Sequence, residues 1–163
     1  MLPEILQEWE KRARRPGNLS VMSTRWTEAE ADAATQGLKL AIFQFLPPLN
    51  QSHRILEIGC GIGRFTQDLG QKAGQTYAID ISPTMLARAQ NTIATDHTFL
   101  LRQPGHHLSF PEASFDLVFE VTVLPHIVSD PLFRQTLTEM TRVTKPSGSI
   151  FICDPLAEGN HSQ

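Results

Sequence analysis

The sequence predicts an α/β fold with a doubly wound, mostly parallel sheet of five strands and an N-terminal helical cap. From residue 54 onward, apolar runs of strand length alternate with amphipathic stretches of helix length. This alternation is typical of parallel sheets with right-handed crossover connections. A glycine-rich turn follows the first strand, and such turns let a ligand approach bare backbone. At 163 residues, one domain is expected.

Five short apolar runs are the predicted strands, and the stretches between them have helical periodicity. The strands are 54–58, 76–80, 98–102, 115–122 and 148–153, and the main helices between them are 62–72, 83–95 and 131–144. Ser82 is the predicted N-cap of the middle helix, and Pro83 suits its first turn.

Before residue 50 the pattern is helical. A first helix over residues 3–14 places its apolar residues Ile5, Leu6, Trp9 and Ala13 on one side. Thr27, with Glu30 three residues later, has the spacing of a capping box and begins a second helix. Its predicted buried stripe is Ala31, Ala34, Leu38, Ala41 and Phe45. We therefore expect residues 1–50 to form a helical cap of the same domain as residues 51–163.

The turn after the first strand carries most of the functional information. Residues 55–63 read Ile-Leu-Glu-Ile-Gly-Cys-Gly-Ile-Gly, so an acid, Glu57, is followed by glycines at alternate positions, Gly59, Gly61 and Gly63. The start of the next helix adds unpaired N–H groups and a partial positive charge, which suit a carboxylate or phosphate. The turn predicts a nucleotide-type pocket.

The spacing of the glycines disfavours two common nucleotide sites. The dinucleotide pattern G-x-G-x-x-G needs glycine at 64 or 66, where the chain has Arg64 and Thr66. A P-loop needs Gly-Lys-Ser/Thr after the turn, and this is absent. A nicotinamide-dependent oxidoreductase is therefore disfavoured.

The remaining pattern, E-x-G-x-G-x-G, resembles motif I of the class I S-adenosylmethionine-dependent methyltransferases, which have a Rossmann-like fold of seven strands. The resemblance continues in residues 76–80, 114–120 and 142–152, which match later family motifs in order. It implies S-adenosylmethionine as cofactor and methyl transfer as activity.

The resemblance also implies a set of cofactor-binding residues. In the family, the acid at the Asp80 position accepts hydrogen bonds from both ribose hydroxyls, and the residue at the Met85 position packs on the adenine. Glu120 is expected either to contact the methionine half of the cofactor or to support that contact from behind. The expected set is Glu57, Gly59, Cys60, Gly61, Gly63, Asp80, Ile81, Met85, Gly105 and Glu120.

Methyl transfer from a sulfonium mainly requires that the nucleophile be held in line with the methyl group. A general base helps only where the nucleophile carries a proton. His126, just after the fourth strand, is the candidate catalytic base, and a structural or loop-capping role is the alternative. The six histidines lack metal-ligand spacing, so no metal is expected.

The sequence departs from the family pattern in two places. Pro104 stands where relatives carry an acid that binds the adenine amino group, so we expect packing and the Gly105 backbone to hold that ring. Ten mostly polar residues follow Cys153, too few for the family's last two strands, which leaves Ile150 and Ile152 on an apolar edge. Three explanations stay open: a homodimer, a partner chain that supplies the missing wall, or a damaged acceptor site.

The composition indicates which compartment and which kinds of partner to expect. The formal net charge of −3 gives no electrostatic reason to expect nucleic acid. No run of 18 apolar residues is present, so no membrane segment is expected. Two cysteines do not form a disulfide framework, and reduced thiols in the cytoplasm are the expectation.

The expected function is S-adenosylmethionine-dependent methyl transfer to a small-molecule or other modest acceptor. A non-catalytic S-adenosylmethionine-binding module, acting as a subunit or a truncated relative, is the alternative. A protein N-terminal methyltransferase also stays open, because residues 61–64, Gly-Ile-Gly-Arg, occur in such enzymes. Residues 120–123 lack the Asn/Asp-Pro-Pro-aromatic motif of nucleic-acid amino methyltransferases.

Overall fold

The computed structural model describes residues 2–22 and 25–155, and its centre is a five-stranded sheet in the order β3-β2-β1-β4-β5. All neighbouring strands are paired in parallel. The strands are β1 (Arg54–Ile58), β2 (Gln75–Asp80), β3 (Thr98–Arg102), β4 (Phe115–Val121) and β5 (Thr144–Cys153). The strand order reverses between β1 and β4, and ligands collect at the carboxyl ends of the strands at such a switch point. The predicted Rossmann-like fold is confirmed.

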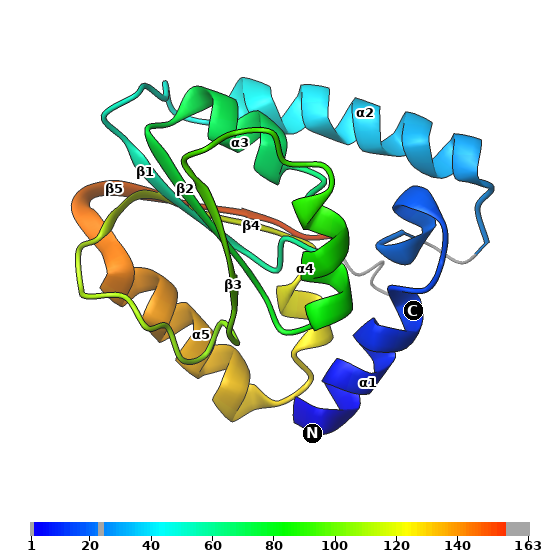
Figure 1. The fold of residues 1–163 in the computed structure, drawn as a ribbon. Coiled ribbons are helices and arrows are strands. Elements are labelled where there is room, and N and C mark those ends of the chain that lie inside the picture. The colour runs from blue at the N-terminus through cyan, green and yellow to red at the C-terminus, as the bar shows by residue number, and fades with distance from the viewer. Residues whose placement is uncertain (1, 23–24, 156–163) are drawn as a thin grey trace, which may run out of the picture.

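Helices cover both faces of this sheet. They are α1 (Leu2–Arg12), α2 (Glu28–Phe45), α3 (Thr66–Lys72), α4 (Pro83–Gln90) and α5 (Asp130–Val143), with short 3₁₀ turns η1 (Gly17–Ser20) and η2 (Leu124–His126). Figure 1 shows α2 and α3 on one face, α5 on the other, and α1 beside α4 past the carboxyl ends of the central strands. The predicted capping box of α2 and the Ser82 N-cap of α4 are both present.

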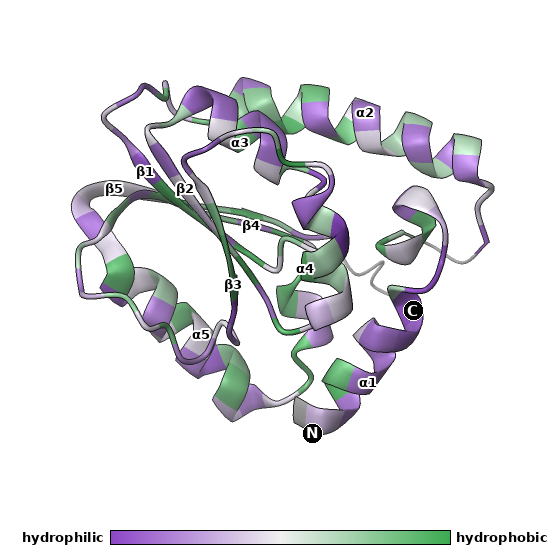
Figure 2. Cartoon of the chain, in the orientation of Figure 1, coloured by the Kyte–Doolittle hydropathy of each residue, from purple (hydrophilic) through white to green (hydrophobic). Residues whose placement is uncertain are grey.

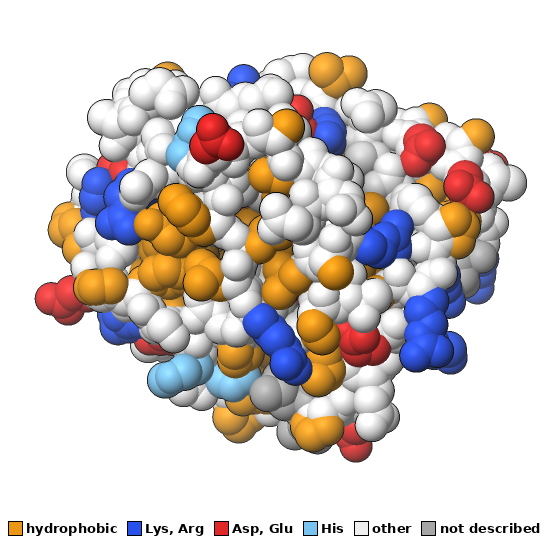
Figure 3. Space-filling view, viewed as in Figure 1, with side chains coloured by type: hydrophobic (Ala, Val, Ile, Leu, Met, Phe, Trp, Pro, Cys, Tyr) orange, Lys and Arg blue, Asp and Glu red, His pale blue; other side chains and the backbone are white. Residues whose placement is uncertain are grey.

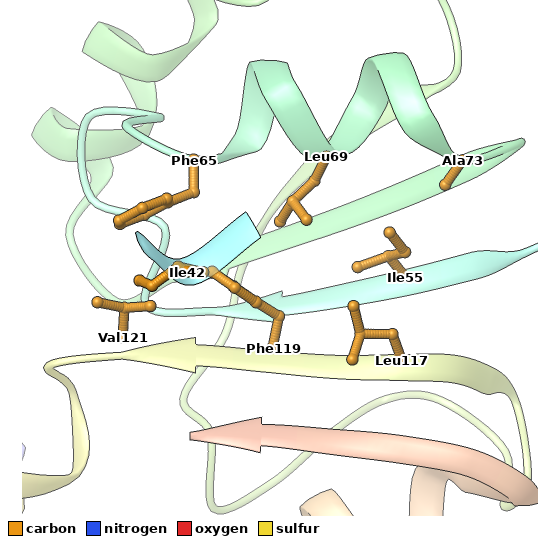
Figure 4. Packing of buried hydrophobic residues seen from close by; sticks show 8 residues of the cluster. All are labelled: Ile42, Ile55, Phe65, Leu69, Ala73, Leu117, Phe119 and Val121. Carbon is orange, nitrogen blue, oxygen red and sulfur yellow. The ribbon is translucent and has the colours of Figure 1, made fainter. Parts of the chain in front are cut away.

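Successive side chains of each strand point to opposite faces of the sheet, so a hydrophobic core forms on each face. Ile55 and Phe119 point towards α2 and α3, where they pack with Phe65 and Leu69 of the α3 side (Figure 4). Leu56 and Val118, one residue away on each strand, belong to the core on the α5 side with Met140 and Val143. Figure 2 shows apolar residues along the strands and polar residues on the outer sides of the helices.

Two helices are shorter than predicted. The chain turns through residues 61–65 because Gly61 and Gly63 take positive φ angles of 54° and 83°, so α3 begins only at Thr66. Helix α4 ends at Gln90 because the next N–H groups, of Asn91 and Thr92, donate to carbonyl oxygens three residues back, which tightens the chain into a turn.

The predicted buried stripe of α2 is partly wrong. Ala31 is buried, but the line of burial then runs through Thr35 and Ile42. Ala41 is exposed, and Phe45, the last residue of the helix, is 77% exposed. The two rows of side chains are neighbours on the helix surface, and the sequence pattern alone does not show which row faces α3.

Both edges of the sheet present apolar side chains. On β5, Ile150 and Ile152 are 39% and 45% exposed, as expected for an edge strand. On β3, Phe99 and Leu101 are similarly exposed, and Phe99 stacks on Tyr77. Figure 3 shows apolar side chains gathered over β3, on the side towards α5.

Candidate active site

A pocket lies at the carboxyl ends of β1, β2 and β4. The predicted site residues that line it are Glu57, Gly59, Cys60, Gly61, Asp80, Ile81, Gly105 and His126. Three predicted residues, Gly63, Met85 and Glu120, are not part of its lining. The topology thus brings most of the expected residues into one place.

The three glycines of the turn make room for different neighbours. A Cβ atom on Gly59 would collide with the side chain of Val123, in the loop after β4. One on Gly63 would lie 2.8 Å from Thr92 Oγ1 and 3.2 Å from Ala89 Cβ, so this glycine allows the turn to pack on α4. One on Gly61 would lie 3.0 Å from Val21 Cγ1 of the cap, at the pocket itself.

Asp80 links the end of β2 to the glycine turn. Its Oδ2 accepts the Gly61 N–H at 2.9 Å, and its Oδ1 accepts the Ser82 N–H at 2.9 Å. The Cys60 N–H donates to the Ile79 carbonyl oxygen at 2.9 Å, which fixes the turn against the same strand. Burial raises the pKa of Asp80 and the backbone donors oppose that rise. Backbone N–H groups therefore hold the carboxylate at the pocket wall.

Glu57 is buried beneath the turn. Its Oε2 accepts the Thr66 hydroxyl at 2.6 Å, and burial raises its pKa to about 8. The carboxyl group is therefore mostly protonated at pH 7, when it can donate as well as accept a hydrogen bond. Burial likewise raises the pKa of the Cys60 thiol, which leaves that group neutral.

Arg64 is a pocket residue that the sequence reasoning missed. Its guanidinium packs 4.8 Å from the centre of the Phe65 ring, and its Nη1 lies 2.9 Å from Met22 Sδ. Burial lowers its pKa, and the nearby Glu57 opposes that shift. The signal was present in the sequence, since Arg64 is the residue that breaks the dinucleotide pattern.

Glu120 lies behind the pocket. Its side chain is fully buried, and its Oε1 accepts the backbone N–H groups of Val123 and Leu124, the latter at 3.1 Å. Burial, reinforced by the neighbouring Asp154 carboxylate, raises its pKa to about 7. Glu120 thereby shapes the turn that brings His126 to the pocket.

Comparison with known proteins shows to which family the chain belongs. Residues 56–152 match the methyltransferase domain family, which is more than half of the chain. The chain belongs to the class I S-adenosylmethionine-dependent methyltransferases. Members of this family use S-adenosylmethionine as the methyl donor.

Individual relatives agree with that assignment. The chain is 35% identical over 113 residues to phosphoethanolamine N-methyltransferase 3 of Arabidopsis thaliana, covering 68% of this chain and 23% of that protein. It is 34% identical over 111 residues to 2-methyl-6-phytyl-1,4-hydroquinone methyltransferase of Synechocystis sp., covering 67% and 33% respectively.

A solved structure shares the fold over most of the chain. Phosphoethanolamine N-methyltransferase 1 of Haemonchus contortus, in complex with phosphoethanolamine and S-adenosylhomocysteine, superimposes with a TM-score of 0.80 at 25% identity, covering 92% of this chain and 31% of that one. The chain spans less than half the length of these relatives.

Several groups that line this pocket are chemically suited to the methyltransferase cofactor. Asp80 offers carboxylate oxygens for hydroxyl groups, and Arg64 offers a positive charge for a carboxylate. The loop after β3 contributes Gln103, Pro104 and Gly105, and Gln103 is a further pocket residue that the sequence reasoning missed. Met85 is fully buried in the first turn of α4, beneath the pocket wall.

Helix α1 lines the other side of the methyltransferase pocket. Ile5 and Trp9 of α1 line it together with His126, whose ring meets the Trp9 ring edge-on at 4.9 Å between centroids. Burial, followed by the nearby charge of Arg12, lowers the pKa of His126, so its imidazole is neutral at pH 7.

Polar contacts hold α1 against α4. Glu10 accepts hydrogen bonds from the Ser82 and Thr84 hydroxyls, the latter at 2.6 Å. The Arg88 guanidinium donates to the carbonyl oxygens of Ala13 and Arg15 at 2.8 Å. These contacts join the cap to the helix that follows Asp80.

Three further observations concern the described residues. Both cysteines, Cys60 and Cys153, are free thiols. Within residues 2–22 and 25–155, no three His, Cys, Asp or Glu side chains gather as a metal site requires. None of the helices in the same ranges is long and apolar enough to cross a bilayer.

Proposed function

We propose that this chain binds S-adenosylmethionine and transfers its methyl group to a small-molecule acceptor. The observation that carries the proposal is the joint placement of Asp80 and the glycine turn, linked by a hydrogen bond, in the pocket at the switch point. Membership of the methyltransferase family supports the same reading.

Each part of the pocket has a role in this proposal. Asp80 accepts hydrogen bonds from the ribose hydroxyls, and Arg64 pairs with the methionine carboxylate. Gly61 leaves the backbone open to the ligand, while Pro104 and Gly105 pack against the adenine. When bound, the cofactor supplies a methyl group on a good leaving group. The chain's own task is to orient the acceptor and exclude water, which α1 does by covering the pocket.

His126 is the candidate for proton transfer. Its imidazole is neutral at pH 7 and lies at the pocket wall, so it can accept a proton from a hydroxyl or an ammonium group of the acceptor. Its edge-on contact with Trp9 gives it a structural role as well, since that contact joins α1 to η2.

Calorimetry with S-adenosylhomocysteine tests the cofactor site, and transfer of a labelled methyl group to a panel of acceptors tests the activity. We expect binding with a one-to-one stoichiometry and turnover on at least one acceptor class. Absence of binding by a folded chain would refute the proposal.

The alternative, a non-catalytic binding module, is favoured by one observation: the apolar edge of β5 has no neighbouring strand among the described residues. Binding without turnover in isolation, and turnover on addition of a partner, would support a subunit role.

We propose that a second copy of the chain or a partner chain covers Ile150 and Ile152. Sedimentation of the wild type beside Ile152→Lys tests this, because the charged variant should lose self-association. The protein N-terminal methyltransferase reading has no further support beyond residues 61–64.

The free thiols of Cys60 and Cys153 fit a reducing compartment, and we propose the cytoplasm. We also propose that residues 1–50 act as a cap of the domain formed by residues 51–163, because Ile5, Trp9 and Val21 line its pocket.

A further inference from the structure

The pocket has two chemically different halves. One half, at the ends of β1 and β2, carries the ionisable groups Glu57, Asp80 and Arg64. The other half is built by α1, the turn after β4 and the start of α5. Most of its side chains are apolar, namely Ile5, Trp9, Val123, Ile127 and Leu132, while Thr122 and His126 are polar.

We infer that the acceptor is an uncharged, largely apolar molecule with a hydroxyl group, of the phenol or hydroquinone class. The inference rests on the proposed function, because it assigns the charged half of the pocket to the cofactor. The apolar half is then what remains to contact the acceptor. Burial of an apolar ring against Trp9, Ile127 and Leu132 is favourable in proportion to the area removed from water.

The charges of the residues that line the pocket disfavour an acceptor with a phosphate or a carboxylate. Among the described residues that line the pocket, Arg64 is the one with a fixed positive charge, and it lies at the glycine turn beside Glu57. Arg12 is on α1, but it bonds to Glu8 at 3.0 Å and lies over the Trp9 ring at 5.0 Å, so its charge is already engaged. A buried anion at the apolar half would lack a partner, and such burial is costly.

His126 is the ionisable side chain among the described residues that line this half, and Thr122 and Trp9 add neutral polar groups. A neutral imidazole has one ring nitrogen free to accept a hydrogen bond, and a hydroxyl donates one. Other charged groups that bear on this ring are Arg12, Glu8 and Asp154, and none of these three lines the pocket. A largely apolar wall whose polar groups are neutral is therefore matched by an uncharged apolar ring with a hydroxyl group.

A matched pair of probes tests the inference: 4-butylphenol, which is neutral at pH 7, and 4-butylbenzoate, which carries a negative charge on a similar skeleton. Their binding is measured by calorimetry and by intrinsic tryptophan fluorescence, with S-adenosylhomocysteine present at saturation. We expect the phenol to bind about tenfold more tightly or better, which corresponds to the cost of one unpaired charge in a partly exposed site. O-Phosphoethanolamine should bind more weakly than the phenol.

Leu132→Lys provides the converse measurement. A cation on the apolar wall should reduce phenol affinity and raise benzoate affinity, which reverses or abolishes the preference. Val128→Lys is the matched control, because Val128 is 79% exposed on the same segment and is not part of the pocket lining. It should leave both affinities unchanged.

The outcomes separate the two proposals. If S-adenosylhomocysteine binds but the two probes bind equally, the benzoate binds better, or neither binds, the acceptor class is wrong and the cofactor assignment stands. If S-adenosylhomocysteine does not bind to the folded chain, both proposals fall. If Val128→Lys changes the preference as much as Leu132→Lys does, the acceptor wall is placed wrongly and the inference is overturned.

Discussion

The Asp80 carboxylate accepts the backbone N–H of Gly61 at 2.9 Å, across 19 residues of sequence. Two features that look independent in the chain, an acid at the end of a strand and a run of glycines, therefore form one unit. The same carboxylate also accepts the Ser82 N–H, so it is oriented from both sides before any ligand binds. Preorganisation of this kind lowers the cost of binding.

Replacement of Asp80 by Ala should weaken S-adenosylhomocysteine binding by about 1.5–3 kcal/mol, because the ribose hydroxyls lose a charged acceptor. Calorimetry measures the change. Asp80→Asn is the control, since it keeps one acceptor oxygen and should lose less. An unchanged dissociation constant in a folded Asp80→Ala variant would refute the ribose role.

Substitution of Gly61 by Val should abolish detectable cofactor binding, because the residue has a φ of 54° and a side chain there would occupy the pocket beside Val21. Gly37→Ala is the comparison. Gly37 lies within α2 and an added Cβ would meet nothing within 4 Å, so this change should raise the free energy of unfolding by about 0.5–1 kcal/mol and leave binding alone. Urea unfolding and calorimetry on both variants check the pair, and normal affinity in Gly61→Val would contradict the assignment.

Glu57 should make the chain less stable as pH rises. Burial raises its pKa to about 8, above the unfolded value of about 4.5, so the native carboxyl keeps a proton that the unfolded chain has lost. This contribution is fully present below about pH 4.5, declines by up to about 1.4 kcal/mol per pH unit, and is lost by about pH 8. Glu57→Gln should remove this part of the pH dependence. Urea unfolding of both proteins at pH 5.5 and pH 8 measures it, and parallel pH dependences would argue against a protonated Glu57.

His126→Ala should leave S-adenosylhomocysteine affinity unchanged, because the ring lines the half of the pocket that we assign to the acceptor. If His126 is the base, kcat should fall and the acidic limb of the pH–rate profile should disappear. His107→Ala, at an exposed site outside the pocket lining, is the control. A loss of stability with a normal kcat in the His126 variant would assign the residue to the Trp9 contact instead.

Local pattern was enough to predict the strands, the glycine turn and Asp80, because strand–turn–strand geometry fixes where those residues meet. It was not enough to choose between the two roles expected for Glu120, whose carboxylate accepts N–H groups of the loop after its own strand. Nor did it predict that Trp9 meets His126, since these residues are far apart in the chain and only the docking of α1 joins them. When a pocket wall comes from elements that are distant in the sequence, no local sequence pattern predicts it.

Glu10 accepts hydrogen bonds from Ser82 and Thr84, at the start of α4 just after Asp80, and so holds α1 against the segment that carries this acid. Fragments that start at residue 51 would keep every family motif, yet without α1 their pocket would be open to bulk water. We therefore expect turnover measured on such fragments to differ from turnover measured on a chain that keeps α1.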